Sequence, residues 1–151
     1  MNIALVFALT LAASCSNPAT ETPAETQGTT SGTATEQVAA AEQTTIAKNV
    51  STAEFQQLMQ DHPDAILLDV RTPGEVAGGM IPNAQNIDFR DPGFAAKIGE
   101  LAKDKPVLVY CASGNRSGQA MRMMADQGFT EVYNLSGGFG AWSSEGLPTN
   151  H

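Results

Sequence analysis

The chain has 151 residues, a formal net charge of −8 and two cysteines. This length allows one compact domain of ordinary size together with a shorter extra segment. The acidic balance, without any cluster of Lys or Arg, excludes nucleic acid as a partner, because phosphate groups need cations to neutralise them. Two cysteines are too few for a disulfide framework or for a zinc site built from several thiolates.

The N-terminal segment carries an apolar run. From Ile3 to Ala13 the only polar residue is Thr10. An apolar run of about eleven residues is typical of the h-region of a secretory signal and is shorter than a membrane span of roughly 18 residues. We therefore expect residues 1–14 to be a signal peptide.

Small residues lead from this run to Cys15. The stretch Leu11–Cys15 resembles a bacterial lipobox, in which the cysteine is acylated and becomes the new N-terminus. Ala12 stands where lipoprotein signals usually have Leu. The positively charged residues expected at the start of a signal peptide are also missing, since no Lys or Arg precedes Lys48. The alternative is an ordinary cleaved signal peptide. The resemblance predicts an exported protein, periplasmic or on the cell surface, that is anchored to a bacterial membrane through lipid on Cys15.

The next segment is poor in apolar residues. It consists mainly of Ser, Asn, Pro, Ala, Thr, Glu, Gln and Gly, and Val38 is its one larger apolar residue. Such a composition cannot bury enough apolar surface to offset the entropy lost on ordering. We expect residues 15–45 to be a disordered tether and residues 46–151 to be the folded domain.

The remainder alternates between short apolar runs and stretches with helical spacing. Continuous apolar runs predict two strands that are buried on both faces. The alternation predicts an α/β fold with a small, mainly parallel sheet flanked by helices, and it places the site beyond the carboxyl ends of the strands. The predicted strands are 46–50, 65–70, 84–87, 107–110 and 132–135. The predicted helices are 51–62, 73–77, 94–101, 119–127 and 139–143.

Cys111 follows the second buried strand, and a loop of small residues leads from it into a helix. Such a loop can turn its backbone N–H groups inward as an anion nest, and the helix N-terminus adds partial positive charge. Arg116 can add a full charge. These features lower the pKa of a cysteine and produce the nucleophilic thiolate. We therefore predict that Cys111 is a nucleophile. The alternative, a buried structural cysteine, would have no use for Arg116 or the glycines.

At this point four stretches, in the right order, resemble the signatures of the rhodanese-like family. The resemblance covers residues 47–150 and implies a rhodanese-like α/β fold. Met80 stands where the family usually has His, and we expect a change of packing there without loss of chemistry. The four stretches are Leu67–Glu75, Gly79–Ala84, Cys111–Ser117, and Leu135–Trp142 with Gly146–Pro148.

The resemblance implies a thiosulfate sulfurtransferase-like enzyme. Cys111 would take a sulfane sulfur from thiosulfate or a similar donor as a persulfide and pass it to cyanide, a thiol or a protein acceptor. No metal and no organic cofactor is implied. Arg116 would orient the donor and stabilise the persulfide. The other loop residues would form the substrate-binding cradle, mostly through their backbone: Ala112, Ser113, Gly114, Asn115 and Ser117.

Two other functions stay open. Phosphatases and arsenate reductases that resemble this family have five residues between the cysteine and the arginine, whereas four separate Cys111 from Arg116. The shorter loop suits a single sulfur better than a tetrahedral oxyanion. The second alternative is a persulfide carrier or binding module that barely turns over small donors.

Other conspicuous residues are predicted to have structural roles, and Glu75 is left without one. We expect His62 to be solvated in a turn, Asp69 and Arg71 to be structural partners, and Gly137–Gly138 to allow a tight turn. We assign four residues to the core: Met121, Met123, Met124 and Trp142.

Overall fold

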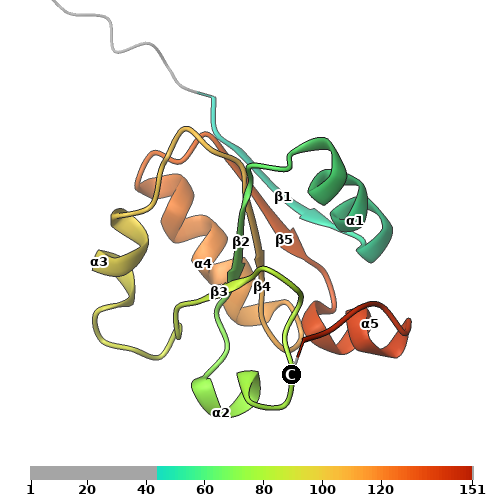
Figure 1. The fold of residues 1–151 in the computed structure, drawn as a ribbon. Coiled ribbons are helices and arrows are strands. Elements are labelled where there is room, and N and C mark those ends of the chain that lie inside the picture. Colours follow the sequence, from blue (N-terminus) through green and yellow to red (C-terminus); the bar gives the residue numbers. More distant parts are fainter. Residues whose placement is uncertain (1–43, 151) are drawn as a thin grey trace, which may run out of the picture. The chain divides into compact units, whose positions relative to one another are not determined.

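The computed structural model describes residues 44–150 (Figure 1). The predicted signal peptide, Cys15 and nearly all of the predicted tether lie outside these residues. Within them, no helix is long and apolar enough to cross a membrane. The elements in chain order are β1 (Ile46–Val50), α1 (Thr52–Asp61), β2 (Ile66–Asp69), α2 (Pro73–Val76), β3 (Gln85–Asn86), α3 (Phe94–Gly99), β4 (Val107–Tyr110), α4 (Asn115–Asp126), β5 (Glu131–Leu135) and α5 (Gly138–Ser144).

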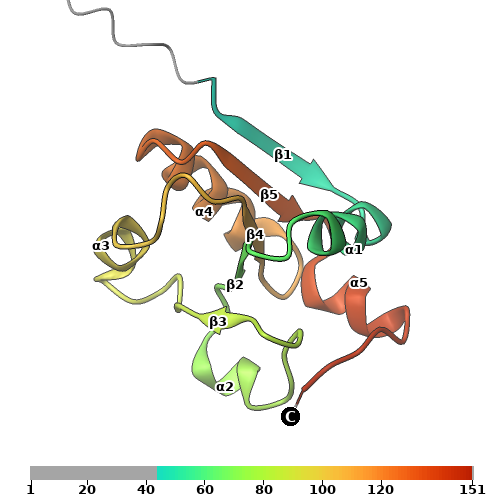
Figure 2. The same cartoon turned by 45° about the horizontal axis from the view of Figure 1, so that its top comes forward.

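The strands form one sheet in the order β1-β5-β4-β2-β3, and every neighbouring pair is parallel. β4 lies at the centre, and its side chains alternate between two cores. Val107 and Val109 pack with α3 and α4, whereas Leu108 and Tyr110 pack with α1 and α5. Figure 2 shows the helices on both sides of the sheet. The predicted α/β fold with a small parallel sheet is confirmed.

The boundary that matters most for the site is the start of α4. The sequence predicts a helix from residue 119, but α4 begins at Asn115, immediately after Gly114. The first turn has no apolar residues, so the hydrophobic spacing does not reveal it. Arg116 and Ser117 therefore belong to the first turn of a helix, where backbone N–H groups have no partner within the helix.

The residues assigned to the core lie there. Met121 and Met124 are buried, and Met123 packs against them from a partly buried position. Trp142 is 3% exposed, and its Nε1 donates a hydrogen bond to the Pro148 carbonyl at 2.8 Å. Its ring meets that of Phe55 edge-on at 6.3 Å. The indole thus joins α1, α5 and the C-terminal segment.

Candidate functional site

Cys111 directly follows β4, at the carboxyl end of the central strand, and is 1% exposed. This is the edge of a parallel sheet where ligands usually bind. The backbone N–H of Gly114 donates a hydrogen bond to its Sγ at 3.1 Å. Gly114 has a φ of 92°, and a Cβ there would lie 3.1 Å from the Leu135 carbonyl oxygen. Glycine is therefore required for the turn that aims this N–H at the sulfur.

The surroundings of the Cys111 sulfur favour its charged form. Burial raises the pKa of the thiol, but the Ser117 hydroxyl and the loop N–H groups near the sulfur lower it by more. The pKa therefore lies below its ordinary value. The N–H donors belong to Ser117, Ser113 and Gly114. Among the described residues the Ser117 hydroxyl has no oxygen or nitrogen partner, although it is buried. It is therefore free to donate to a charged sulfur.

The first two carbonyl groups of the same loop accept hydrogen bonds from backbone N–H groups at the start of α5. The N–H of Phe139 donates to the Cys111 carbonyl at 2.7 Å, and the N–H of Gly140 donates to the Ala112 carbonyl at 2.9 Å. A Cβ on Gly138 would overlap the Cys111 carbonyl oxygen. Gly137 and Gly138 both have positive φ, which confirms the predicted tight turn. Because α5 binds the carbonyls, the loop N–H groups are left to face the sulfur.

Asn134, on β5, ties the loop to the sheet. Its side chain is buried, and Nδ2 donates to the Gly114 carbonyl at 3.1 Å and to Asn49 Oδ1 at 2.7 Å. The sequence analysis missed this residue, because one Asn in a short strand carries no recognisable signal. Its contacts make it a positioning residue for the Cys111 loop.

Arg116 reaches across the mouth of the loop to Glu75. Its Nη1 lies 2.9 Å from Glu75 Oε2, and its Nη2 lies 2.6 Å from Glu75 Oε1. The bidentate guanidinium lowers the pKa of Glu75 to about 2. The carboxylate in turn raises the pKa of Arg116, and the Cys111 sulfur adds to that effect. The Arg116 guanidinium thus lies beside both a carboxylate and the Cys111 sulfur.

Glu75 is a second residue that sequence reasoning left without a role. It occupies the third position of α2, and its Oε2 accepts hydrogen bonds from the Thr72 N–H at 3.0 Å and the Thr72 hydroxyl at 2.9 Å. The spacing of a Thr and a Glu three residues later is a readable capping box. That signal marks the start of a helix, but it does not reveal the pairing with Arg116, 41 residues away.

Comparison with known proteins agrees with this geometry. The sequence model of the family of rhodanese-like domains matches residues 51–145. The chain belongs to the rhodanese-like family. A sulfurtransferase from Allochromatium vinosum is 39% identical over 99 residues, which cover 66% of this chain and 91% of that protein. The thiosulfate sulfurtransferase GlpE of Pseudoalteromonas translucida is 31% identical over 97 residues, covering 64% and 90%.

Solved structures give the same result. The crystal structure of a rhodanese-related protein from Thermoplasma volcanium matches with a TM-score of 0.60 at 31% identity, covering 68% of this chain and 97% of that one. The family resemblance read from the four sequence signatures is thus confirmed for the rhodanese-like domain.

A second arginine–carboxylate pair lies in the interior of the rhodanese-like domain. Arg71 Nη2 lies 2.6 Å from Asp69 Oδ2 and donates to the Gly79 carbonyl at 2.7 Å. The guanidinium carbon is 4.0 Å from the centre of the Phe139 ring. Asp69 is 0% and Arg71 3% exposed. The predicted pairing of these two residues is confirmed, and their burial keeps them from direct contact with a dissolved substrate.

The remaining residues that the sequence analysis singled out differ in exposure and position. Ser113 and Asn115 are exposed, and Ala112 is half-buried. His62, expected to be solvated, is half-buried at the C-cap of α1. Met80 pairs through its backbone N–H and carbonyl with Asn150. Within residues 44–150 no three His, Cys, Asp or Glu side chains gather as metal ligands.

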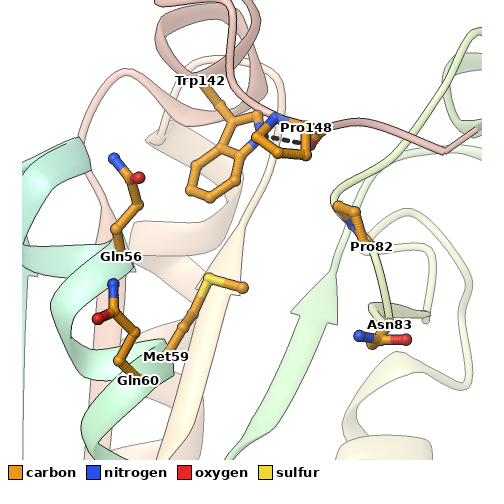
Figure 3. Close-up of a pocket in the computed structure, with 7 residues that line it drawn as sticks. All are labelled: Gln56, Met59, Gln60, Pro82, Asn83, Trp142 and Pro148. Atoms are coloured by element: carbon orange, nitrogen blue, oxygen red, sulfur yellow. Dashed lines mark hydrogen bonds between the residues drawn. The ribbon is translucent and has the colours of Figure 1, made fainter.

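A cavity of about 250 Å³ lies away from the Cys111 loop, between α1, α5 and the Pro82–Asn83 turn (Figure 3). Its lining is uncharged and includes no residue of the loop. This lining contains no Cys, Ser, Asp, Glu, His or Lys side chain that could act as a nucleophile or a proton donor. The lining residues are Gln56, Met59, Gln60, Pro82, Asn83, Trp142 and Pro148.

Proposed function

We propose that the protein is a sulfurtransferase that carries a sulfane sulfur on Cys111. Membership of the rhodanese-like family, and relatives named as sulfurtransferases, support this class of enzyme. The single observation that carries the proposal is the cradle of donors around the Cys111 sulfur, which lowers the pKa of the thiol despite its burial. A group that stabilises a thiolate equally suits the negative terminal sulfur of a persulfide.

The reaction has two displacement steps. The Cys111 thiolate attacks the outer sulfur of a donor such as thiosulfate. The sulfur–sulfur bond of the donor breaks, and sulfite leaves with the electron pair. In the second step cyanide or a thiolate attacks the terminal sulfur of the persulfide, and Cys111 leaves as the thiolate. Protons and electrons balance in both steps without a further reactant.

The residues around the sulfur have distinct roles in this scheme. The N–H groups of Ser113, Gly114 and Ser117 hold the charge of the thiolate and then of the persulfide. Arg116 attracts the anionic donor and the departing anion. Four residues separate Cys111 from Arg116, and this short loop supports transfer of a single sulfur over phosphate or arsenate chemistry.

We propose further that the domain works outside the cytoplasm, on a lipid anchor. The support is the sequence pattern alone: an apolar run from Ile3 to Ala13, a lipobox-like approach to Cys15, and a polar tether over residues 15–45. This arrangement would hold the rhodanese-like domain near a membrane surface while leaving the Cys111 loop accessible.

The test is thiosulfate:cyanide sulfur transfer by the full chain, compared with Cys111→Ser and with Cys15→Ser as the matched control. We expect turnover to vanish in Cys111→Ser and to persist in Cys15→Ser. Intact-mass measurement after exposure to donor should show one added sulfur atom only when Cys111 is present. A persulfide without turnover would instead indicate a carrier module. The absence of both would overturn the proposal and direct attention to phosphate esters and arsenate.

A further inference from the structure

The mouth of the Cys111 loop carries a particular balance of charges. The thiolate and Glu75 contribute one negative charge each, because the pKa of Glu75 is about 2. Arg116 contributes one positive charge. Arg71 adds no net charge, because its ion pair with Asp69 in the interior neutralises it. Within residues 44–150 no lysine is hydrogen bonded to the loop or to Glu75. These side chains together therefore carry one net negative formal charge when Cys111 is a thiolate.

The pairing of Arg116 with Glu75 is well defined but remains open to solvent. Both terminal nitrogens of Arg116 bind the carboxylate, and Thr72 holds the carboxylate in place with its N–H and hydroxyl. The Arg116 side chain is 18% and the Glu75 side chain 34% exposed. An incoming anionic donor thus meets Arg116 with its charge already offset and two of its donors occupied.

We infer that Glu75 is a specificity-determining residue that makes the Cys111 loop prefer sulfur donors with a single negative charge, such as alkyl persulfides and thiosulfonates, over dianions such as thiosulfate. The inference rests on the proposed function. The repulsion between Glu75 and a donor grows in proportion to the charge of the donor. A dianion therefore loses twice as much binding free energy as a monoanion of the same shape.

The chemistry is the same for both classes of donor. The Cys111 thiolate attacks the outer sulfur, the bond from that sulfur to its carrier breaks, and the carrier leaves with the electron pair. Thiosulfate releases sulfite, a thiosulfonate releases a sulfinate, and an alkyl persulfide releases a thiolate. No oxidant or reductant is needed, so the charge of the donor is the property on which Glu75 acts.

The test compares thiosulfate with methanethiosulfonate, in which a methyl group replaces one charged oxygen. In Glu75→Gln the capping box is retained, because Gln serves at this position as well as Glu. Removing one charge about 6 Å from the donor should raise kcat/KM about tenfold for the dianion and about threefold for the monoanion. Salt at about 1 M should abolish most of this change in kcat/KM between the wild type and Glu75→Gln. Glu54→Gln, which alters the equivalent position in the capping box of α1, is the matched control and should change neither value.

A second measurement does not depend on sulfur transfer. In a Cys15→Ser background, Cys111 is alkylated with iodoacetate, an anion, and with iodoacetamide, which is neutral. Glu75→Gln should raise the ratio of the two rates about threefold. An unchanged ratio, or a fall of kcat/KM for thiosulfate in Glu75→Gln, would overturn the inference and leave Glu75 as a support for Arg116. If neither protein used any donor but the alkylation ratio rose, the proposed function would fail while the effect of Glu75 on charge preference would be supported.

Discussion

The domain contains two arginine–carboxylate pairs that differ in burial and in sequence separation. In the pair of Asp69 and Arg71 the side chains are 0% and 4% exposed, and the partners lie two positions apart. In the pair of Glu75 and Arg116 the side chains are 34% and 18% exposed, and the partners lie 41 positions apart. The same kind of ion pair thus occurs once in the interior and once beside the Cys111 sulfur.

The difference shows in the partners of each guanidinium. Arg71 binds Asp69 and the Gly79 carbonyl and lies over the Phe139 ring, so its surroundings are filled. Arg116 binds Glu75 and interacts with the Cys111 sulfur, and it keeps an exposed side. The first pair therefore belongs to the architecture at the end of β2, whereas the second lies beside the Cys111 sulfur, where we propose that it sets the charge met by a donor.

The largest expected effect is on stability, from breaking the buried pair. Arg71→Met leaves the Asp69 carboxylate buried without its partner. Removing one member of a buried ion pair costs about 3–5 kcal/mol of the free energy of unfolding. Urea denaturation followed by the fluorescence of Trp142, the single tryptophan of the chain, measures this loss.

The matched change in the other pair is Arg116→Met. Because this pair is partly exposed, we expect it to lose less than about 1 kcal/mol in the same measurement. Equal losses in the two variants would contradict the division between an architectural pair and a site pair.

The next effect separates the two arginines by their influence on Cys111. The rate of alkylation by iodoacetamide should rise with pH through a midpoint below 9.0, the ordinary pKa of the thiol. In Arg116→Met the midpoint should move upward by up to about one pKa unit, since a nearby positive charge has been lost. Arg71→Lys, which keeps its charge, should leave the midpoint unchanged.

The lowered pKa of Cys111 also determines whether stability rises or falls with pH. Because the folded protein favours the thiolate, the contribution of Cys111 to the free energy of unfolding is absent below the folded pKa and complete above about 9. Stability of the wild type should therefore rise across this range relative to Cys111→Ser. A fall with rising pH would show that burial outweighs the hydrogen bonds to the sulfur.

The last prediction concerns the two capping boxes. Ser51 and Thr72 accept hydrogen bonds from the N–H groups of Glu54 and Glu75 at 3.3 and 3.4 Å. Replacing either with Ala should lower the free energy of unfolding by about 1 kcal/mol. Only Thr72→Ala should also move the midpoint of Cys111 alkylation, by less than Arg116→Met does, because Thr72 holds the partner of Arg116. A similar shift in Ser51→Ala would point to a general loosening of the fold.

Sequence reasoning succeeded where the signal was local. The apolar run at 107–110 predicted the central strand, and the small residues after it predicted a loop that exposes N–H groups to Cys111. It placed the start of α4 too late, because Asn115 and Arg116 carry no apolar periodicity. It gave neither Glu75 nor Asn134 a role in the site, since the partners of both lie far away along the chain.

The sequence by itself determined the alternation of strands and helices and the family, and it predicted Cys111 as the nucleophile, because each depends on residues that are near neighbours in the chain. Only the tertiary structure decided what surrounds the loop. The sheet order places β2 beside β4, so the segments that follow them meet and Glu75 reaches Arg116. The start of α5 binds the loop carbonyls for the same reason, since β5 lies on the other side of β4. Strand order depends on how all the elements bury their apolar faces together, and no single stretch of sequence encodes it.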